Sequence, residues 1–358
     1  MSETHARRRS LLRAELRAGD LDALLVTDLL NLRYLTGFTG SNAALLVHAE
    51  DEERSVFCTD GRYITQSETQ VPDLRRVIDR PCDIALARSA HGRLGFESHK
   101  VTVEGLDLLS EAGTAELVRA PGLVERLRLI KDEAEVEALR MACAAADRAL
   151  ADLVEHGGLR PGRSELEVAR ELESRMLEHG AAGPAFETIA AAGPNSAIPH
   201  HRPTGAVLRS GDFVKLDFGA RVDGYHSDMT RTFVLGAAAD WQREVYELVA
   251  AAQAAGRAAL EVGAKVADVD AAARSVIETG GHGERFLHGL GHGVGLQVHE
   301  APALSKVGVG TLAAGMAVTV EPGVYLAGRG GVRIEDTLVV RADAPELLTL
   351  TTKDLVVV

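Results

Sequence analysis

The stretch that most constrains the fold of this 358-residue chain is residues 214–234, which read VKLDFGARVDGYHSDMTRTFV. Apolar and polar residues alternate on both sides of Asp223-Gly224. Such a dipeptide between two alternating runs is a strong short-range signal for a β-hairpin with a two-residue turn. The sequence therefore predicts two antiparallel strands that meet at this turn.

This hairpin would bring two carboxylates together. With the turn at residues 223–224, Asp217 faces Thr230 and Gly219 faces Asp228. Asp217 and Asp228 then become diagonal neighbours on one face of the strands, unless a one-residue bulge breaks the register. Because two adjacent carboxylates repel each other, we expect either a bound cation or a proton between them.

Composition and charge exclude several classes of protein. The chain has 52 Asp and Glu against 39 Lys and Arg, and this net charge of −13 argues against nucleic acid or an anionic membrane as a partner. No apolar run has the length of a signal-peptide core or a membrane span, so we expect a cytoplasmic protein. The three cysteines lack CxxC spacing and are expected to be free, buried thiols: Cys58, Cys82 and Cys143.

The chain is long enough for two domains. Residues 1–125 alternate strand-like apolar runs with helical segments, which predicts an α/β domain. Residues 124–155 are rich in alanine and charged side chains, with apolar residues three and four apart, which predicts one long helix. We place the domain boundary near Arg126, between domains 1–125 and 126–358. Other helices are expected at residues 10–18, 164–179, 241–262 and 266–278.

Histidines concentrate in residues 281–300, GHGERFLHGLGHGVGLQVHE, which contain His282, His288, His292 and His299. Glycines at positions 289, 291, 293 and 295 exclude an ordinary helix, so His288 and His292 are not the helical zinc pair of an HExxH motif. A single histidine is usually just a hydrogen-bonded core or surface residue, but four in a glycine-rich stretch favour a site. The spacing leaves open which of them contacts a metal.

Two further carboxylates lie in residues 316–340, MAVTVEPGVYLAGRGGVRIEDTLVV, which predict a second pair of strands around AGRGG. Glu321 ends one apolar run and Glu335 lies in the next, where a buried glutamate is costly unless it is paired or metal-bound. A salt bridge to Arg333 would satisfy one of them. Four carboxylates in strands, with one or more histidines, are enough to hold two divalent ions that activate water to hydrolyse an amide or phosphate ester. Oxygen-rich ligands favour Mn²⁺ or Co²⁺, with Zn²⁺ as an alternative.

Four motifs, in this order and at these separations, resemble the metallopeptidases of the pita-bread fold, specifically the Xaa-Pro peptidases aminopeptidase P and prolidase: LDFGARVDGYHSDMTRTF, HGLGHGVGLQVHE, VTVEPGVYL and GGVRIEDT. GFTGSN (37–42) and DGRY (60–63) resemble the N-terminal creatinase-like domain of the same group. The resemblance implies an α/β (α+β) protein in which a creatinase-like α/β domain precedes a pita-bread domain with a curved antiparallel sheet covered by helices. It also implies a homodimer.

On matching positions the resemblance implies five metal ligands: Asp217, Asp228, His292, Glu321 and Glu335. It implies catalytic roles for four further residues: His200, His288, His299 and Arg333. Glu321 would also carry a proton to the leaving proline nitrogen. His201 and His282 match no position of the family and are expected to be ordinary structural histidines.

The roles of the four further residues differ. His200, in a loop punctuated by Gly and Pro, and His299 would steady the substrate and the tetrahedral intermediate. His288 would lie at the edge of the pocket. Arg333 would hold one of the ligand carboxylates.

The resemblance implies a metallo-exopeptidase for peptides with proline in second position, with two divalent ions, Mn²⁺ first among them. Dipeptide-specific relatives often carry an arginine shortly after the VHE segment, where it can bind the C-terminal carboxylate of the substrate. Here Ala303 takes that place, so we expect an Xaa-Pro aminopeptidase rather than an Xaa-Pro dipeptidase. Arg202 or Arg329 would be the alternative carboxylate anchor.

Three other classes share this fold. Methionine aminopeptidases have the same five ligands but do not usually carry a creatinase-like domain. Creatinase-type hydrolases work without metals, and non-catalytic binding modules of the fold have lost ligands, whereas this chain has all five. Metal content after purification would separate the binding module from the enzymes.

Overall fold

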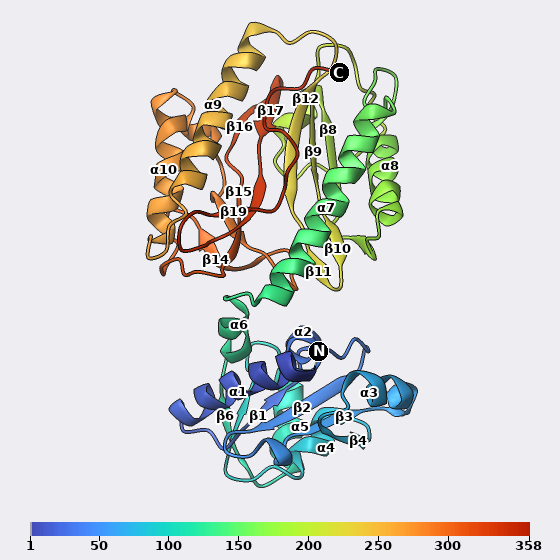
Figure 1. The fold of residues 1–358 in the computed structure, drawn as a ribbon, viewed down its shortest axis with the longest axis vertical. Helices are drawn as coiled ribbons and strands as arrows, with labels where there is room; N and C mark the ends of the chain where they lie inside the picture. Colours follow the sequence, from blue (N-terminus) through green and yellow to red (C-terminus); the bar gives the residue numbers. More distant parts are fainter. Residues whose placement is uncertain (1) are drawn as a thin grey trace. The chain divides into compact units, whose positions relative to one another are not determined.

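The computed structural model describes residues 2–358, and the chain divides between Arg128 and Leu129 into two compact units (Figure 1). The boundary expected near Arg126 falls inside α6 (Leu123–Arg128), the last helix of the first unit. The predicted long helix over residues 124–155 is wrong, because α6 is followed by a separate helix, α7 (Glu133–Glu155). Asp132 caps α7 by accepting from the Glu135 amide, while the Glu135 side chain accepts from the Asp132 amide, and this capping box starts a new helix.

The first unit is built on one mixed sheet with the strand order β4-β3-β2-β1-β5-β6. Its strands are β1 (Ala23–Val26), β2 (Ala43–His48), β3 (Val56–Thr59), β4 (Arg75–Ile78), β5 (Arg93–Phe96) and β6 (Glu116–Arg119). Its α-helices are α1 (Ser2–Ala18), α2 (Leu29–Thr36), α3 (Ile64–Gln70), α4 (Cys82–Ala87), α5 (Val103–Ala112) and α6. The predicted α/β architecture is confirmed, although α1 begins well before the expected residue 10.

The second unit contains four α-helices among its described residues: α7, α8 (Glu165–Glu178), α9 (Asp240–Ala258) and α10 (Val266–Thr279). Its longer strands are β8 (Ile189–Ala192), β9 (Phe213–Phe218), β12 (Met229–Val234), β14 (Glu300–Leu304), β15 (Ala317–Val320), β16 (Gly323–Leu326), β17 (Gly330–Arg333) and β18 (Asp336–Val339). The shorter ones are β7 (Gly183–Pro184), β10 (Ala220–Val222), β11 (Tyr225–His226), β13 (Gly291–Gly293) and β19 (Glu346–Leu347). The pairs between these strands are antiparallel.

Two helix pairs cover the sheets of the second unit from opposite sides (Figure 1). α7 and α8 pack with β8, β9 and β12 in one apolar core, which includes Leu150, Leu172 and Leu216. α9 and α10 pack with β14 to β18 in a second core, which includes Val249 and Val320. The predicted antiparallel sheet covered by helices is thus confirmed, and the strands between the two cores present polar side chains to each other.

Alternation along β9 decides which residues reach the space between the cores. Val214, Leu216 and Phe218 belong to the core under α7 and α8. Successive side chains of a strand point to opposite faces, so Lys215 and Asp217 point away from that core. Both are buried, although they are charged.

The predicted hairpin register is confirmed. Asp217 pairs with Thr230 in the β9–β12 ladder, and Arg221 pairs with His226 beyond it, so no extra residue intervenes. Asp223 and Gly224 both have positive φ, of 47° and 78°, as a two-residue turn of type I′ requires.

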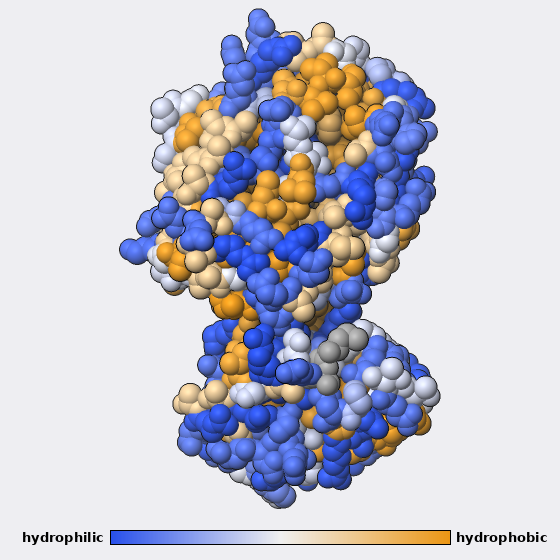
Figure 2. Space-filling model, viewed as in Figure 1, coloured by the Kyte–Doolittle hydropathy of each residue, from blue (hydrophilic) through white to orange (hydrophobic). Residues whose placement is uncertain are grey.

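The polarity of the surface and the state of the cysteines can be compared with what the composition predicts. Figure 2 shows a mostly hydrophilic visible face on the first unit and several apolar areas on the second. Cys58, Cys82 and Cys143 are free and buried, as predicted. No helix in the described part of the chain is both long enough and apolar enough to cross a membrane.

The hairpin depends on a glycine at position 219, where the ladder is interrupted. A Cβ built at Gly219 would lie 1.8 Å from the carbonyl oxygen of Ser227 on the facing strand. We therefore expect Gly219→Ala to lower the free energy of unfolding by about 3 kcal/mol or more, as measured by urea denaturation. Gly205→Ala is the matched control, because a Cβ there meets nothing within 4 Å, and its effect should stay within about 0.5 kcal/mol. Equal effects at the two glycines would contradict this interpretation.

Candidate metal centre and active site

A pocket of about 280 Å³ in the second unit collects most of the predicted site residues. It is lined by Phe186, Glu187, Ile189, His200, His201, Arg202, Asp217, Asp228, His292, Val298, His299, Glu321 and Glu335. All five predicted metal ligands are in this lining, together with His200 and His299. His288 and Arg333 contact these residues from behind.

Three of the four carboxylates reach the pocket from interruptions in the strands, which the sequence did not indicate. Asp217 lies within β9, as expected, but Asp228 lies between β11 and β12. Glu321 follows β15, and Glu335 lies between β17 and β18. Their backbone amides are still satisfied, since Glu321 N–H donates to the Leu290 carbonyl (2.8 Å) and Glu335 N–H to the Thr230 carbonyl (3.1 Å). In a regular strand, successive side chains point to opposite faces. At these breaks the carboxylate side chains instead point into the pocket.

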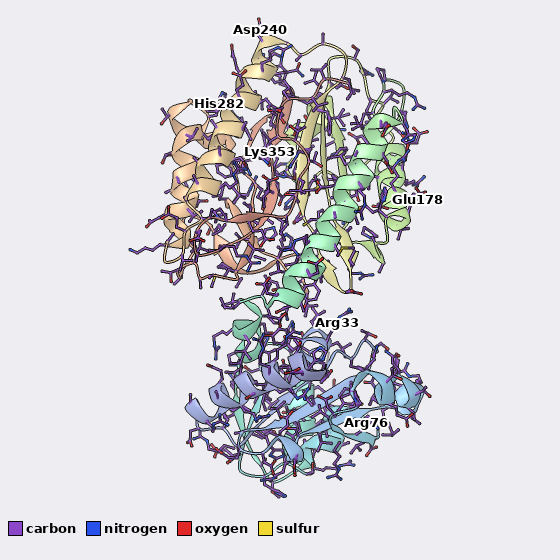
Figure 3. All side chains as sticks on the ribbon, viewed as in Figure 1. Arg33, Arg76, Glu178, Asp240, His282 and Lys353 are labelled. Atoms are coloured by element: carbon purple, nitrogen blue, oxygen red, sulfur yellow. The ribbon has the colours of Figure 1, made fainter. Side chains whose placement is uncertain are left out.

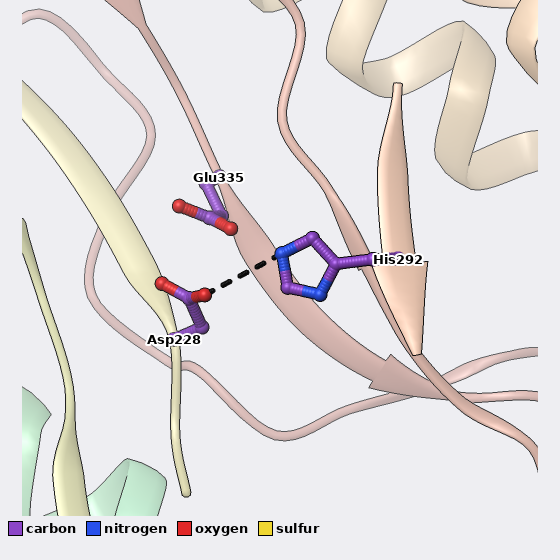
Figure 4. A group of neighbouring side chains, drawn as sticks. All are labelled: Asp228, His292 and Glu335. Atoms are coloured by element: carbon purple, nitrogen blue, oxygen red, sulfur yellow. Dashed lines mark ion pairs between the residues drawn. The ribbon is translucent and has the colours of Figure 1, made fainter. Parts of the chain in front are cut away.

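Three of the predicted ligands meet at the centre of the pocket. Asp228, His292 and Glu335 each offer a ligand atom, and these atoms lie within 4.8 Å of one another (Figure 4). His292 Nε2 is 3.6 Å from Asp228 Oδ2 and 3.5 Å from Glu321 Oε1. His292 Nδ1 lies 3.0 Å from the Gly293 carbonyl, to which it must donate. That hydrogen bond leaves Nε2 as the lone-pair nitrogen that faces the carboxylates.

Burial and mutual repulsion dominate the electrostatics of the carboxylates. Burial raises the pKa of Asp228 well above its usual range, and the charges of Glu335, Asp217 and Glu321 raise it further. Burial likewise raises the pKa of Glu335, with added repulsion from Glu321 and Asp217. The pKa of Glu321 rises to about 8, mainly through burial. Without a cation, Glu321 therefore retains its proton near neutral pH, and Asp228 and Glu335 keep theirs to higher pH than an ordinary carboxyl group does.

One oxygen in this group has no partner. Asp217 Oδ1 is buried and forms no hydrogen bond, whereas Oδ2 accepts from Arg333. Buried polar atoms are rarely left unsatisfied, so an orphaned carboxylate oxygen among further carboxylates and an imidazole nitrogen fits a divalent cation. The residues present thus suit a metal centre, with oxygen ligands in the majority.

Arg333 connects the carboxylates to the surrounding structure. It is buried and donates to Asp217, to the Thr230 hydroxyl (3.0 Å), to the Tyr325 hydroxyl (2.8 Å) and to the Pro199 carbonyl (3.2 Å). The salt bridge to Glu321 that the sequence left open is longer, at 3.9 Å. Arg333 therefore holds Asp217 first and contributes positive charge to the whole cluster.

His288 lies behind the pocket rather than in its lining. Its Nδ1 donates to the Gly289 carbonyl (2.8 Å), and its Nε2 is 2.8 Å from the Tyr325 hydroxyl. Since Arg333 donates to the same hydroxyl, Tyr325 can donate in turn to His288. Burial lowers the pKa of His288 to about 3, so the ring is neutral and suited to accept that hydrogen bond.

His200 and His299 flank the mouth of the pocket, and both are exposed. The His299 ring packs edge-on against His292, with 4.4 Å between centroids, and burial lowers the pKa of His299. His282, left outside the predicted site, follows α10 at the outer side of the unit (Figure 3) and is not in the lining.

The sequence did not predict four of the residues that line the pocket: Phe186, Glu187, Ile189 and Val298. His201 was expected to be an ordinary structural histidine, but it also lines the pocket, and its Nε2 is 2.8 Å from the buried Glu165. Glu165 also accepts from Thr204, Asn195 and the Ala192 amide. The sequence contains no local signal for this cluster, because α8 and the loop meet only in the folded unit.

The raised pKa values predict how the stability of the metal-free protein changes with pH. Between pH 6.5 and 8 the buried histidines act in the opposite sense, because burial lowers their pKa in the folded state, whereas an unfolded histidine, with a pKa near 6.5, still releases its proton over this range. Between pH 6.5 and 8 an unfolded chain has released the Glu321 proton, whereas the folded state, with a pKa of about 8, retains it. The stability that this group contributes at low pH is therefore lost as pH rises, by about 1.4 kcal/mol per pH unit per group.

Urea unfolding of EDTA-treated protein at pH 6.5 and 8 measures this loss. The stability of wild type relative to Glu321→Gln should fall over this range, because the histidine contribution is common to both proteins. Added Mn²⁺ should abolish the Glu321 contribution, because a bound cation replaces the proton. A stability difference between metal-free wild type and Glu321→Gln that stays constant between these two pH values would show that Glu321 is not protonated in the folded state.

Comparisons with known proteins identify the family of this chain. Residues 137–342 match metallopeptidase family M24, and residues 8–130 match the creatinase/prolidase N-terminal domain. The chain is 33% identical to an Xaa-Pro dipeptidase of Pyrococcus furiosus, over 94% of this chain and 95% of that protein. The structure is also similar to an Xaa-Pro dipeptidase from Bacillus anthracis (TM-score 0.94, 38% identity, 99% of this chain and 100% of that one).

An X-Pro aminopeptidase from Thermotoga maritima is similar as well, with a TM-score of 0.88 and 32% identity over 95% of this chain and 98% of that one. The resemblance noted in the sequence is therefore confirmed over nearly the whole length. This chain belongs to metallopeptidase family M24 and carries the creatinase/prolidase type of N-terminal domain.

Proposed function

We propose that this metallopeptidase is an Xaa-Pro dipeptidase, which hydrolyses the amide bond before a C-terminal proline. The observation that carries this choice is the full-length similarity to two proteins named Xaa-Pro dipeptidase. The expectation from Ala303 pointed instead to an Xaa-Pro aminopeptidase. That activity remains the second candidate, supported by the similarity to the Thermotoga maritima enzyme.

Five residues would hold two divalent ions: Asp217, Asp228, His292, Glu321 and Glu335. Such ions polarise the scissile carbonyl and supply a water-derived nucleophile at neutral pH. Mn²⁺ suits the oxygen-rich ligands. We also keep as proposals a homodimeric assembly, as the family resemblance implies, and a cytoplasmic location, for which the absence of a long apolar run in the sequence is the support.

The remaining steps fall to side chains of the pocket. Glu321, as the family resemblance implies, would also shuttle a proton to the leaving proline nitrogen. His299 and His200, which line the pocket, would donate to the oxyanion that develops on the scissile carbonyl. Arg333 keeps Asp217 in place during this charge movement.

A dipeptide differs from a longer peptide in presenting its terminal carboxylate close to the scissile bond. Arg202 lines the pocket, and its Nε is 3.2 Å from Glu187 Oε2. Both side chains are largely exposed, at 83% and 62%, so the arginine can exchange its partner for a substrate carboxylate. Arg329, the other anchor considered, stacks on Trp241 at 4.1 Å and is not in the pocket lining. We thus propose that Arg202 binds the substrate carboxylate, a role for which position 303, an alanine here, offers no charged side chain.

The direct test compares an Xaa-Pro dipeptide with an Xaa-Pro-Xaa tripeptide, using metal-stripped protein supplied with Mn²⁺. We expect the dipeptide to have the higher kcat/KM and the Glu335→Ala variant to cleave neither. A preference for the tripeptide would favour the aminopeptidase. Cleavage of neither substrate by metal-loaded wild type would reject proline specificity.

Arg202→Ala tests the proposed anchor. We expect KM for the dipeptide to rise about fivefold, which corresponds to ~1 kcal/mol for a solvent-exposed ion pair, while KM for the dipeptide amide is unchanged because the amide lacks the charge. Arg329→Ala is the matched control and should leave both values unchanged. An equal rise in KM for the dipeptide and for its amide would show that Arg202 does not bind the substrate carboxylate.

A further inference from the structure

We propose that Lys215 is a positioning residue that holds His200 in place at the mouth of the pocket, an inference that rests on the role proposed for His200. Lys215 lies in β9, two residues before Asp217, and its side chain is fully buried. Its ammonium group donates to the carbonyls of Ile198 (2.7 Å) and Pro199 (3.2 Å). These are the two residues that directly precede His200.

The surroundings of Lys215 give it no other evident task. Within residues 2–358 its ammonium forms no ion pair with a carboxylate. The Tyr325 ring centroid is 5.2 Å from Nζ, and the charged groups near Lys215 are Arg333 and Asp217, which act on it in opposite senses. Burying an ammonium that forms no ion pair is costly, and a methionine of similar length would pack there without that cost. What the lysine provides, and a methionine cannot, is donors for two backbone carbonyls.

The loop needs such an anchor because its own surface is exposed. Ile198 is 48% exposed, and His200 is exposed to the pocket. Pro199 has no backbone N–H, so its carbonyl is the group through which it can be held, and both Lys215 and Arg333 donate to it. Through Arg333 the same carbonyl is linked to Asp217.

On the other side of His200 the chain is anchored independently. The ring of His201 pairs with the buried Glu165, which also accepts two hydrogen bonds from Thr204. His200 is therefore the exposed residue between two buried attachment points, one cationic and one anionic. Removing the cationic one should free the backbone immediately before His200 while the second attachment and the metal ligands remain.

The experiment is a double-mutant cycle of Lys215→Met and His200→Ala on Xaa-Pro dipeptide hydrolysis. We expect Lys215→Met to lower kcat about tenfold with little change in KM, and to have almost no further effect in the His200→Ala background. Bound metal, measured by elemental analysis, should remain that of wild type, and the unfolding midpoint should not fall. Lys265→Met, an exposed lysine of the same unit, is the control and should behave as wild type.

Amide hydrogen exchange provides a readout that does not depend on activity. Lys215→Met should speed exchange at His200 and Ile198 and leave the central residues of β9 unchanged. If Lys215→Met fails to fold, Lys215→Gln, which keeps a shorter donor, replaces it and should give a smaller loss of kcat.

An equal loss of kcat with and without His200, a loss of metal, or unchanged exchange at residues 198–200 would each overturn the proposal. If wild type cleaves neither peptide, the proposed function fails, and the exchange measurement still decides whether Lys215 holds this loop.

Discussion

The repulsion among four carboxylates, three of them buried and Glu321 partly buried, is the constraint on which the rest of the second unit depends. Asp217, Asp228, Glu321 and Glu335 line one pocket, and burial together with their mutual charge raises the pKa of the last three. A fold can hold such a group only with protons or cations. This explains why an oxygen of Asp217 is left without a protein partner and why a fixed arginine stands behind the cluster.

Two basic side chains lie behind the carboxylate cluster, and they interact with it to different extents. Arg333 contacts Asp217 directly and Glu321 at longer range, and it orients Tyr325 toward His288. Lys215 lies on the same face of β9 as Asp217 but directs its charge to backbone carbonyls instead. The neutral histidines around the pocket, whose pKa values are lowered by burial, add no charge, and the N–H groups of His288 and His292 donate to backbone carbonyls. Arg333 is therefore the cation that acts directly on the carboxylates.

In the proposed function, substrate length would be decided at the rim of the pocket rather than at the proposed metal ligands. The position after the VHE segment holds Ala303, which pairs with His292 across β13 and β14 and offers no charge. Arg202 enters the rim from the loop that also carries His200 and His201. A carboxylate anchor carried on this loop would couple recognition of the substrate's end to the placement of the catalytic histidine, because both depend on the same backbone.

Local patterns in the sequence determined the elements that local interactions control. The Asp223-Gly224 turn and the pairing of Asp217 with Thr230 follow from alternation, and the Ser164 capping box marks the start of α8. The order and spacing of the motifs determined the family. The α6–α7 break was missed because the capping box at Asp132 lies inside an otherwise helical pattern.

Only the tertiary structure decided the contacts between segments that are distant in the sequence. The inward turn of Asp228, Glu321 and Glu335 at strand breaks arises from pairing across strands that are distant in sequence. The pairing of Glu165 with His201, and of Lys215 with the carbonyls before His200, joins segments that share no pattern. Sequence periodicity predicts which face of a strand or helix a side chain occupies. Buried hydrogen bonds between remote segments depend instead on the path of the backbone, and this path is fixed only when both apolar cores have formed.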